Sequence, residues 1–243
     1  GSIRTFEEGQ LLKAKVKEGQ VSTQATNWNF LGPTALPTTT ETYYPGLGRI
    51  NAVAVDPGNI DVIYVGSPSG GIWKTTNGGT SWTALADTLA SLGVSDIAID
   101  PNNSNIVYIA TGDADGQQTM SIGVLKSTNA GTTWSTTGSI FTVDSLVQTS
   151  HILIDPNNSN ILHLTSSKGL YRSTDAGANW TLIVPGATYH DIQYGHGTSG
   201  RTLYMSQDGG LLKSVDNGLN WGSVAPVGIS GKSEIGLTKA DTN

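Results

Sequence analysis

The sequence lacks several features that would each point to a class of protein. Its 243 residues include no cysteine, which excludes disulfide bonds and cysteine-ligated zinc. No apolar run approaches the roughly 18 residues that a membrane-spanning helix needs. Only 13% of the residues are charged, and the 13 lysines and arginines are scattered singly in a chain of net charge −6. Without a basic stripe, nucleic acid is not an expected partner.

Glycine, serine, threonine and asparagine are abundant instead, and a ten-residue pattern occurs four times. In each copy a Ser/Thr hydroxyl and an Asn/Asp side chain can bond nearby backbone N–H groups, and a later glycine permits positive φ. A tryptophan ends each copy and can wedge into apolar surface. Because one active site would not need four copies, we interpret these boxed turns as structural. They are Trp73–Trp82, Leu125–Trp134, Tyr171–Trp180 and Leu212–Trp221.

The boxed turns recur at intervals of roughly 40–50 residues, which is typical of repeated supersecondary units. Each unit begins with an apolar-alternating segment, which in three of the four units ends in Asp-Pro, at Asp56-Pro57, Asp100-Pro101 and Asp155-Pro156. A second apolar segment, a glycine, the boxed turn and a last short segment follow. Four short antiparallel strands per unit predict an all-β fold, a β-propeller built from four-stranded antiparallel blades.

The repeat register also predicts how the chain is divided. Residues 1–25 form an N-terminal leader or edge segment, and residues 26–243 form the propeller. We expect a piece of a larger propeller; the alternative is a closed five-bladed ring whose fifth blade combines Ser233–Thr238 with N-terminal strands. The expected parts are a clasp strand at 26–32, whole blades at 48–89, 92–142, 147–185 and 188–228, and the first strand of an incomplete blade within 229–243.

The boxed turns resemble the Asp-box, or bacterial neuraminidase repeat, of sialidases, xyloglucan-specific endoglucanases and sortilin-type propellers. Gly48–Pro57 and Val65–Lys74 are most similar to secreted propeller proteins of Bacteroidetes, many of them cargo of the type IX secretion system. The resemblance implies a secreted or cell-surface protein. Two copies depart from the pattern, with Asn77 and Asn129 in place of aspartate.

Aligning the first strands on their Asp-Pro ends places Ala52, Asp96, His151, Asp191 and Glu234 in one column. First strands line the central channel of a propeller, so we expect these side chains to converge. The long segment Gly112–Gly123 opens on the same face. The expected ligand-binding residues are Arg49, Asp96, Asp113, Asp115, Gln148, His151, His190 and Asp191.

Two readings of this face differ in function. We favour a secreted binding or scaffold module that recognises a protein or glycan without catalysis. The alternative is a glycoside hydrolase, xyloglucanase- or sialidase-like, in which Asp96 with Asp191 or Glu234 act as acid and base across about 5–10 Å. The arginine cluster of sialidases is missing, and Gly66–Gly71 lacks the acidic residue of the endoglucanases. A third, weaker reading is a secretion cargo whose propeller serves an attached domain.

No cofactor is expected. Asp113-Ala-Asp115-Gly116 resembles the start of a calcium loop but lacks a third ligand and the distal glutamate. We interpret it as an acidic turn, with calcium as the weaker alternative. The expected partners are therefore a protein or glycan ligand and the remainder of the propeller or another fragment.

Overall fold

The computed structural model divides the chain into two compact units, Gly1–Gly46 and Leu47–Asn243. It describes residues 49–85, 93–116, 119–138, 140–195, 201–224 and 231–237, all in the second unit. The expected leader at 1–25 and clasp strand at 26–32 lie outside the described residues. No described helix is long and apolar enough to cross a membrane.

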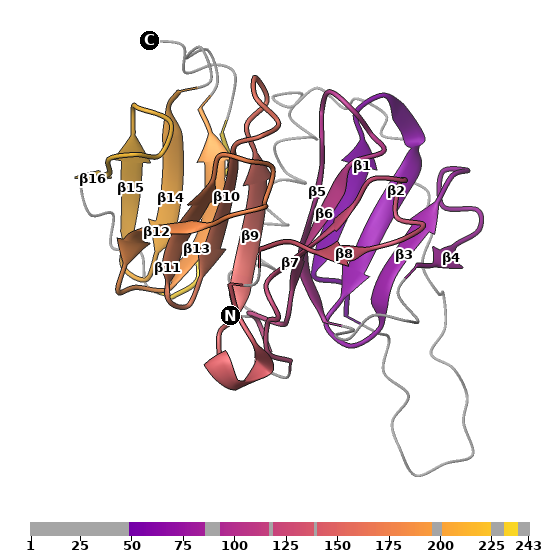
Figure 1. Cartoon of the computed structure of the whole chain (residues 1–243), viewed down its shortest axis with the longest axis horizontal. Coiled ribbons are helices and arrows are strands. Elements are labelled where there is room, and N and C mark those ends of the chain that lie inside the picture. The colour runs from indigo at the N-terminus through magenta and orange to yellow at the C-terminus, as the bar shows by residue number, and fades with distance from the viewer. Residues whose placement is uncertain are drawn as a thin grey trace, which may run out of the picture. The chain divides into compact units, whose positions relative to one another are not determined.

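The second unit contains four antiparallel sheets, and in each sheet four consecutive strands pair in chain order (Figure 1). This confirms the all-β class and the four-stranded blades. Val143–Ser145 forms a short 3-10 helix, η1. Blade 1 is β1 (Ala52–Asp56), β2 (Asn59–Ser67), β3 (Gly71–Thr75) and β4 (Thr83–Ala84); blade 2 is β5 (Val94–Ile99), β6 (Val107–Thr111), β7 (Val124–Ser127) and β8 (Ser135–Thr136); blade 3 is β9 (Thr149–Ile154), β10 (Leu162–Ser166), β11 (Gly169–Ser173) and β12 (Thr181–Pro185); blade 4 is β13 (Tyr189–Tyr194), β14 (Leu203–Gln207), β15 (Gly210–Ser214) and β16 (Gly222–Val224).

The Asp-Pro ends of the first strands make the turns that the sequence suggests, and they also tie neighbouring blades together. Asp56 Oδ1 accepts a hydrogen bond from the N–H of Gly58 at 2.8 Å, which closes an Asx turn. The same oxygen accepts from the hydroxyl of Ser104 in blade 2 at 2.6 Å. Ser159 of blade 3 donates to Asp100 in the same way, at 2.7 Å. One carboxylate thus stabilises both its own turn and the next blade.

Each boxed turn is closed by its own side chains, as the pattern predicts. Ser127 Oγ accepts from the N–H of Gly131 at 2.8 Å, and Asn129 Oδ1 accepts from the N–H of Thr133 at 2.8 Å. Ala130, between them, has φ of 54°. A left-handed residue is unusual outside glycine. The side-chain hydrogen bonds to the N–H groups of Gly131 and Thr133 stabilise this conformation.

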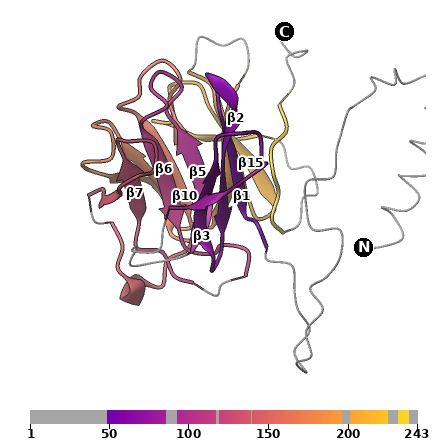
Figure 2. The ribbon, with the colours of Figure 1, turned by 90° about the vertical axis from the view of Figure 1, so that its right-hand side faces the viewer.

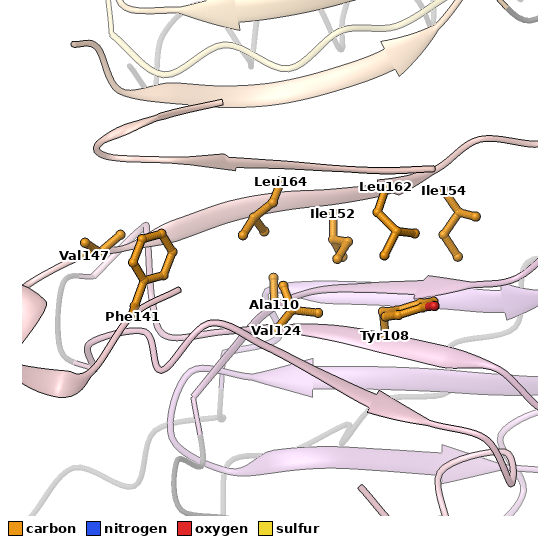
Figure 3. Close-up of a cluster of buried hydrophobic side chains, with 9 residues drawn as sticks. All are labelled: Tyr108, Ala110, Val124, Phe141, Val147, Ile152, Ile154, Leu162 and Leu164. Carbon is orange, nitrogen blue, oxygen red and sulfur yellow. The ribbon is translucent and has the colours of Figure 1, made fainter. Parts of the chain in front are cut away.

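The core lies between blades. The first strands β1, β5, β9 and β13 are successive neighbours, and Figure 2 shows β1 beside β5. Each cluster of buried side chains joins two consecutive blades. Figure 3 shows the middle cluster, in which Tyr108, Ala110 and Val124 of blade 2 face Ile152, Ile154, Leu162 and Leu164 of blade 3. Neighbouring blades therefore share one core, as expected of a stacked-repeat fold.

Residues 231–237 form no strand, where the sequence pattern predicts the first strand of a further blade. The segment nevertheless runs along blade 4. Ser206 Oγ donates to the Ser233 carbonyl at 2.7 Å, and the N–H of Ile235 donates to Asp191 Oδ2 at 2.7 Å. A strand needs a backbone ladder, and these contacts run through side chains instead.

Candidate functional site

A polar cavity of about 290 Å³ lies at the N-terminal ends of the first strands. We call it the central cavity. Asp96, His151 and Asp191, the third residues of β5, β9 and β13, line it together with Ala52, the first residue of β1. Its polar lining comes from the residue before β1, from β5, β9 and β13, from the β6–β7 connection and from the 231–237 segment, and includes Asn51, Ser95, Asp96, Asp115, Ser150, His151, His190, Asp191, Gln193, Lys232 and Glu234.

His151 joins two carboxylates across the central cavity. Its Nδ1 lies 3.3 Å from Asp96 Oδ2 and 3.4 Å from Asp191 Oδ1. The three residues come from three consecutive first strands, β5, β9 and β13. The two carboxylate oxygens can therefore be no farther apart than the sum of these two distances. The structure brings together the carboxylates that the sequence alignment placed in one column.

Both aspartates are also anchored to the neighbouring backbone. Asp96 Oδ2 accepts from the N–H of Ile152 at 2.8 Å, and Asp191 Oδ2 accepts from the N–H of Ile235 at 2.7 Å. Asp191 Oδ1 accepts a further bond from Gln193 Nε2 at 3.1 Å. Each carboxylate thus connects one blade to the next element around the channel and is held in a defined orientation.

Burial raises the pKa of the Asp96 carboxyl above its usual value, and the nearby Asp191 carboxylate adds to the shift. The His151 side chain and the N–H of Ile152 oppose it without cancelling it. A low-dielectric environment disfavours the charged form of a carboxyl group. Asp96 consequently retains its proton to higher pH than an exposed aspartate, a property that general acids in glycoside hydrolases share.

Arg49 and Asp113 pair with each other beside the central cavity and are not among its lining residues. Asp113 Oδ1 also accepts from the N–H of Gly116 at 3.0 Å and from Asn51 Nδ2 at 3.3 Å. Burial by itself would raise the pKa of Asp113, but these hydrogen bonds and the Arg49 charge hold it below its usual value. The pair fastens the β6–β7 connection to the start of β1.

The remaining candidates occupy separate positions. Asp115 lines the cavity and pairs with Lys232. His190 lines it too, and its Nε2 lies 2.9 Å from Asp208 Oδ1. Gln148 lies at the start of β9, where its backbone exchanges hydrogen bonds with Ser167. The described residues contain no group of three or more histidine or acidic side chains that could hold a metal ion.

Sequence reasoning missed Gln193 and Lys232. Gln193 could have been predicted, because residue i+2 of a strand shares the face of residue i and Asp191 was already a candidate. Lys232 carries no comparable signal. It lies in a segment without a strand, and its contact with Asp115 joins residues distant in the chain.

Comparison with known proteins identifies polysaccharide hydrolases as relatives. A xyloglucanase from Hypocrea jecorina (strain QM6a) is 29% identical over 208 residues, 75% of this chain and 23% of that protein. A xyloglucanase from Paenibacillus sp is 27% identical over 150 residues, 57% of this chain and 15% of that protein. No protein-family model matches the chain.

Solved structures support the fold. A GH74 xyloglucanase from Xanthomonas campestris matches with a TM-score of 0.61 at 24% identity, over 73% of this chain and 30% of that one. An ancestral GH74 enzyme matches with a TM-score of 0.58 at 27% identity, over 72% and 25% of the two chains. The fold is a β-propeller. The chain spans less than a quarter of the length of the two curated relatives.

These relatives overturn the expectation of a non-catalytic binding module, because both curated relatives are xyloglucanases. They agree with the conditional expectation that any catalysis would be glycoside hydrolysis. The expectation rested on propellers whose polar channels have no catalytic activity, since a fold does not determine function. The missing sialidase arginine cluster and the missing acid within Gly66–Gly71 added to it, and neither absence concerns the carboxylates of the central cavity.

Proposed function

We propose that this chain contributes to a glycoside hydrolase that cleaves a xyloglucan-type polysaccharide, with the central cavity as its reaction site. The observation that carries the proposal is the placement of Asp96 and Asp191 within 3.4 Å of one imidazole nitrogen in one cavity. Paired carboxylates at short range are what glycoside hydrolysis requires. The xyloglucanase relatives supply the substrate class.

Asp96 takes the role of proton donor. Its raised pKa keeps the carboxyl protonated more readily than an ordinary aspartate. In the proposed step this proton passes to the glycosidic oxygen as the bond from that oxygen to the anomeric carbon breaks. Water then supplies the hydroxyl group of the new reducing end and returns a proton to the enzyme.

Asp191 or Glu234 is the second carboxylate, and both line the central cavity. The upper limit on the Asp96–Asp191 separation admits the roughly 5–5.5 Å found when the second carboxylate attacks the sugar. It reaches only the short end of the roughly 6.5–9.5 Å found when that carboxylate activates water. His151, between the aspartates, is a positioning residue that holds both.

Several finer features belong to the same proposal. Polysaccharides do not cross membranes, so we propose a protein that is secreted or displayed at the cell surface. We assign the boxed turns to the Asp-box type, supported by their hydroxyl and Asn/Asp hydrogen bonds. The proposal also includes the blade divisions drawn from the sequence, a place within a larger propeller and a reaction without a cofactor.

The proposal is tested by incubating the purified protein with xyloglucan and measuring new reducing ends. We expect release by the wild type and a loss of at least about 100-fold in kcat/KM for Asp96→Asn, as removal of a general acid produces. Asp191→Asn and Glu234→Gln identify the second carboxylate, since only one of them should match Asp96→Asn.

Asp144→Asn is the matched control, because Asp144 is an exposed carboxylate on η1, outside the central cavity. It should retain wild-type kcat/KM. A folded wild type that releases no reducing ends, or an Asp96→Asn variant as active as the control, would show that the central cavity does not perform this reaction.

A further inference from the structure

Three of the four first strands carry a β-bulge where they line the central cavity. In blade 3, Ser150 and His151 together oppose the single residue Thr165 of β10. The N–H of His151 donates to Thr165 Oγ1 at 2.9 Å, which anchors the bulge to the sheet. A bulge bends its strand and re-aims the side chains, and here both bulge residues line the cavity.

The bulges of blades 2 and 4 lie at equivalent positions. In blade 4, His190 and Asp191 oppose Ser206 of β14, and the N–H of Asp191 donates to Ser206 Oγ at 3.1 Å. In blade 2 the bulge residues are Ser95 and Asp96. These four bulge residues also line the central cavity. Each bulge therefore adds a polar side chain directly before the residue that the repeat alignment places in the column.

The protein itself uses one of the added side chains and leaves another open. Ser95 is buried, and its hydroxyl donates to the Ala110 carbonyl at 3.1 Å and lies 3.0 Å from the Thr149 hydroxyl. Ser150 is half-buried, and no residue within the described ranges bonds its hydroxyl. Ser150 thus keeps a donor and an acceptor for a ligand in the cavity.

His190 is set up to accept a hydrogen bond. Its Nε2 lies 2.9 Å from Oδ1 of Asp208, which lies between β14 and β15 and does not line the cavity. A carboxylate only accepts hydrogen bonds, so Nε2 carries the proton and Nδ1 is the acceptor. Nδ1 has no partner among the residues that the structure describes. Because the side chain is 12% exposed and lines the cavity, Nδ1 is available to a molecule bound there.

We propose that Ser150 and His190, which we call the bulge pair, bind hydroxyl groups of the sugar whose glycosidic bond is cleaved. They come from the neighbouring first strands β9 and β13 and directly precede His151 and Asp191. His190 Nδ1 accepts from one hydroxyl group, and the Ser150 hydroxyl donates to or accepts from another.

The chemistry of the bulge pair selects a neutral sugar. In the tautomer that Asp208 imposes, neither side chain of the pair carries a charge, and the Asp191 carboxylate next to them repels an anionic group such as that of a uronic acid. Asp208 is a positioning residue, because it acts through His190. The inference rests on the proposed function for the class of ligand.

Binding of a xyloglucan oligosaccharide to the Asp96→Asn protein, measured by isothermal titration calorimetry, tests the bulge pair without turnover. In that background we expect His190→Leu to raise Kd about tenfold and Ser150→Ala about threefold, the effect of losing one hydrogen bond. His190→Asn should stay within about threefold, because its amide oxygen can replace Nδ1. Ser223→Ala, an exposed hydroxyl on β16 outside the cavity, is the matched control and should leave Kd unchanged.

Asp208→Ala tests the positioning role. Nitrogen NMR of the His190 ring should show the Nε2–H tautomer in the wild type and a mixture of tautomers in the variant, with Kd raised about threefold. A residue that only stabilised the fold would leave the tautomer unchanged. The unfolding temperature of each variant shows whether it is folded.

Unchanged Kd in the folded His190→Leu and Ser150→Ala variants would overturn the proposal, and so would a His190→Asn variant that binds as weakly as His190→Leu. Both outcomes leave the proposed hydrolysis intact, since they concern binding alone. Binding that depends on His190 in a protein that releases no reducing ends would remove the hydrolysis and retain the bulge pair as a sugar-binding site. An oligosaccharide that does not bind at all would overturn both.

Discussion

At the scale of single residues, His163 shows how one substitution within a repeat changes the chemistry of an interface. It occupies the position that tyrosine holds in the other blades, and its ring is fully buried. Neither ring nitrogen has a hydrogen-bond partner among the described residues. The boxed turn of blade 4 is bonded to blade 3 and to β13 through the side chain of Asn217 instead. Asn217 Nδ2 donates to Asp155 Oδ2 at 2.6 Å, and Tyr194 Oη donates to Asn217 Oδ1 at 2.8 Å.

Burial, with the Arg172 charge as a second cause, lowers the pKa of His163 to about 4. The unfolded chain therefore binds a proton that the native protein resists, and stability falls as pH drops from about 6.5 to about 4. The loss over that window is about 3 kcal/mol. His163→Leu, of similar size, should remove this component. Urea unfolding at pH 7 and pH 4 measures it, and equal pH dependence of variant and wild type would contradict the assignment.

At the scale of elements, the boxed turns are local structures that the blades then use as contacts. In blade 3, Ser173 Oγ accepts from the N–H groups of Gly177 at 2.9 Å and Asp175 at 3.3 Å and donates to Asp175 Oδ1 at 2.9 Å. These bonds hold Ala176 in its left-handed conformation, with φ of 55°. In this conformation the Ala176 carbonyl accepts hydrogen bonds from Tyr108 Oη and Lys126 Nζ of blade 2.

Ser173→Ala should therefore destabilise the protein by about 1–3 kcal/mol, because it leaves two backbone N–H groups without their acceptor. Ser173 is buried, so water cannot replace the hydroxyl. Chemical denaturation gives the free energy of unfolding. Ser223→Ala, an exposed hydroxyl on β16, is the control and should change it by less than about 0.5 kcal/mol. Equal effects of the two changes would argue against the role of the turn.

At the scale of the second unit, stability resides in the contacts between blades. The three buried clusters each span two consecutive blades. Leu164 belongs to the middle cluster and is fully buried (Figure 3). A cavity at this position weakens the contact between blades 2 and 3 and not the ladder of either sheet.

Leu164→Ala should cost about 2–5 kcal/mol of unfolding free energy, the range for buried leucines. Leu182→Ala on β12 is the matched control, since Leu182 is 41% exposed, and should cost much less. Hydrogen exchange locates the effect, because a weakened contact should speed exchange in blades 2 and 3 more than in blade 1. Uniformly faster exchange would show that the blades unfold as one unit.

The blades and their turns follow from local features of the sequence. Alternating apolar residues, Asp-Pro ends and the boxed hydroxyl pattern act within a few residues, so Ser127 and Asp56 make their bonds whatever surrounds the blade. The repeat alignment also placed Asp96, His151 and Asp191 in one column, because first strands share a register. The alignment favoured binding over catalysis, because it gives no distances between the polar side chains.

The distances and the burial of the residues in that column depend on the packing of the blades. The gap that His151 spans between Asp96 and Asp191 depends on how neighbouring blades pack, and so does the burial that raises the pKa of Asp96. The same holds for the contact of Lys232 with Asp115. These features are set by contacts between distant parts of the chain, whose geometry no local pattern contains.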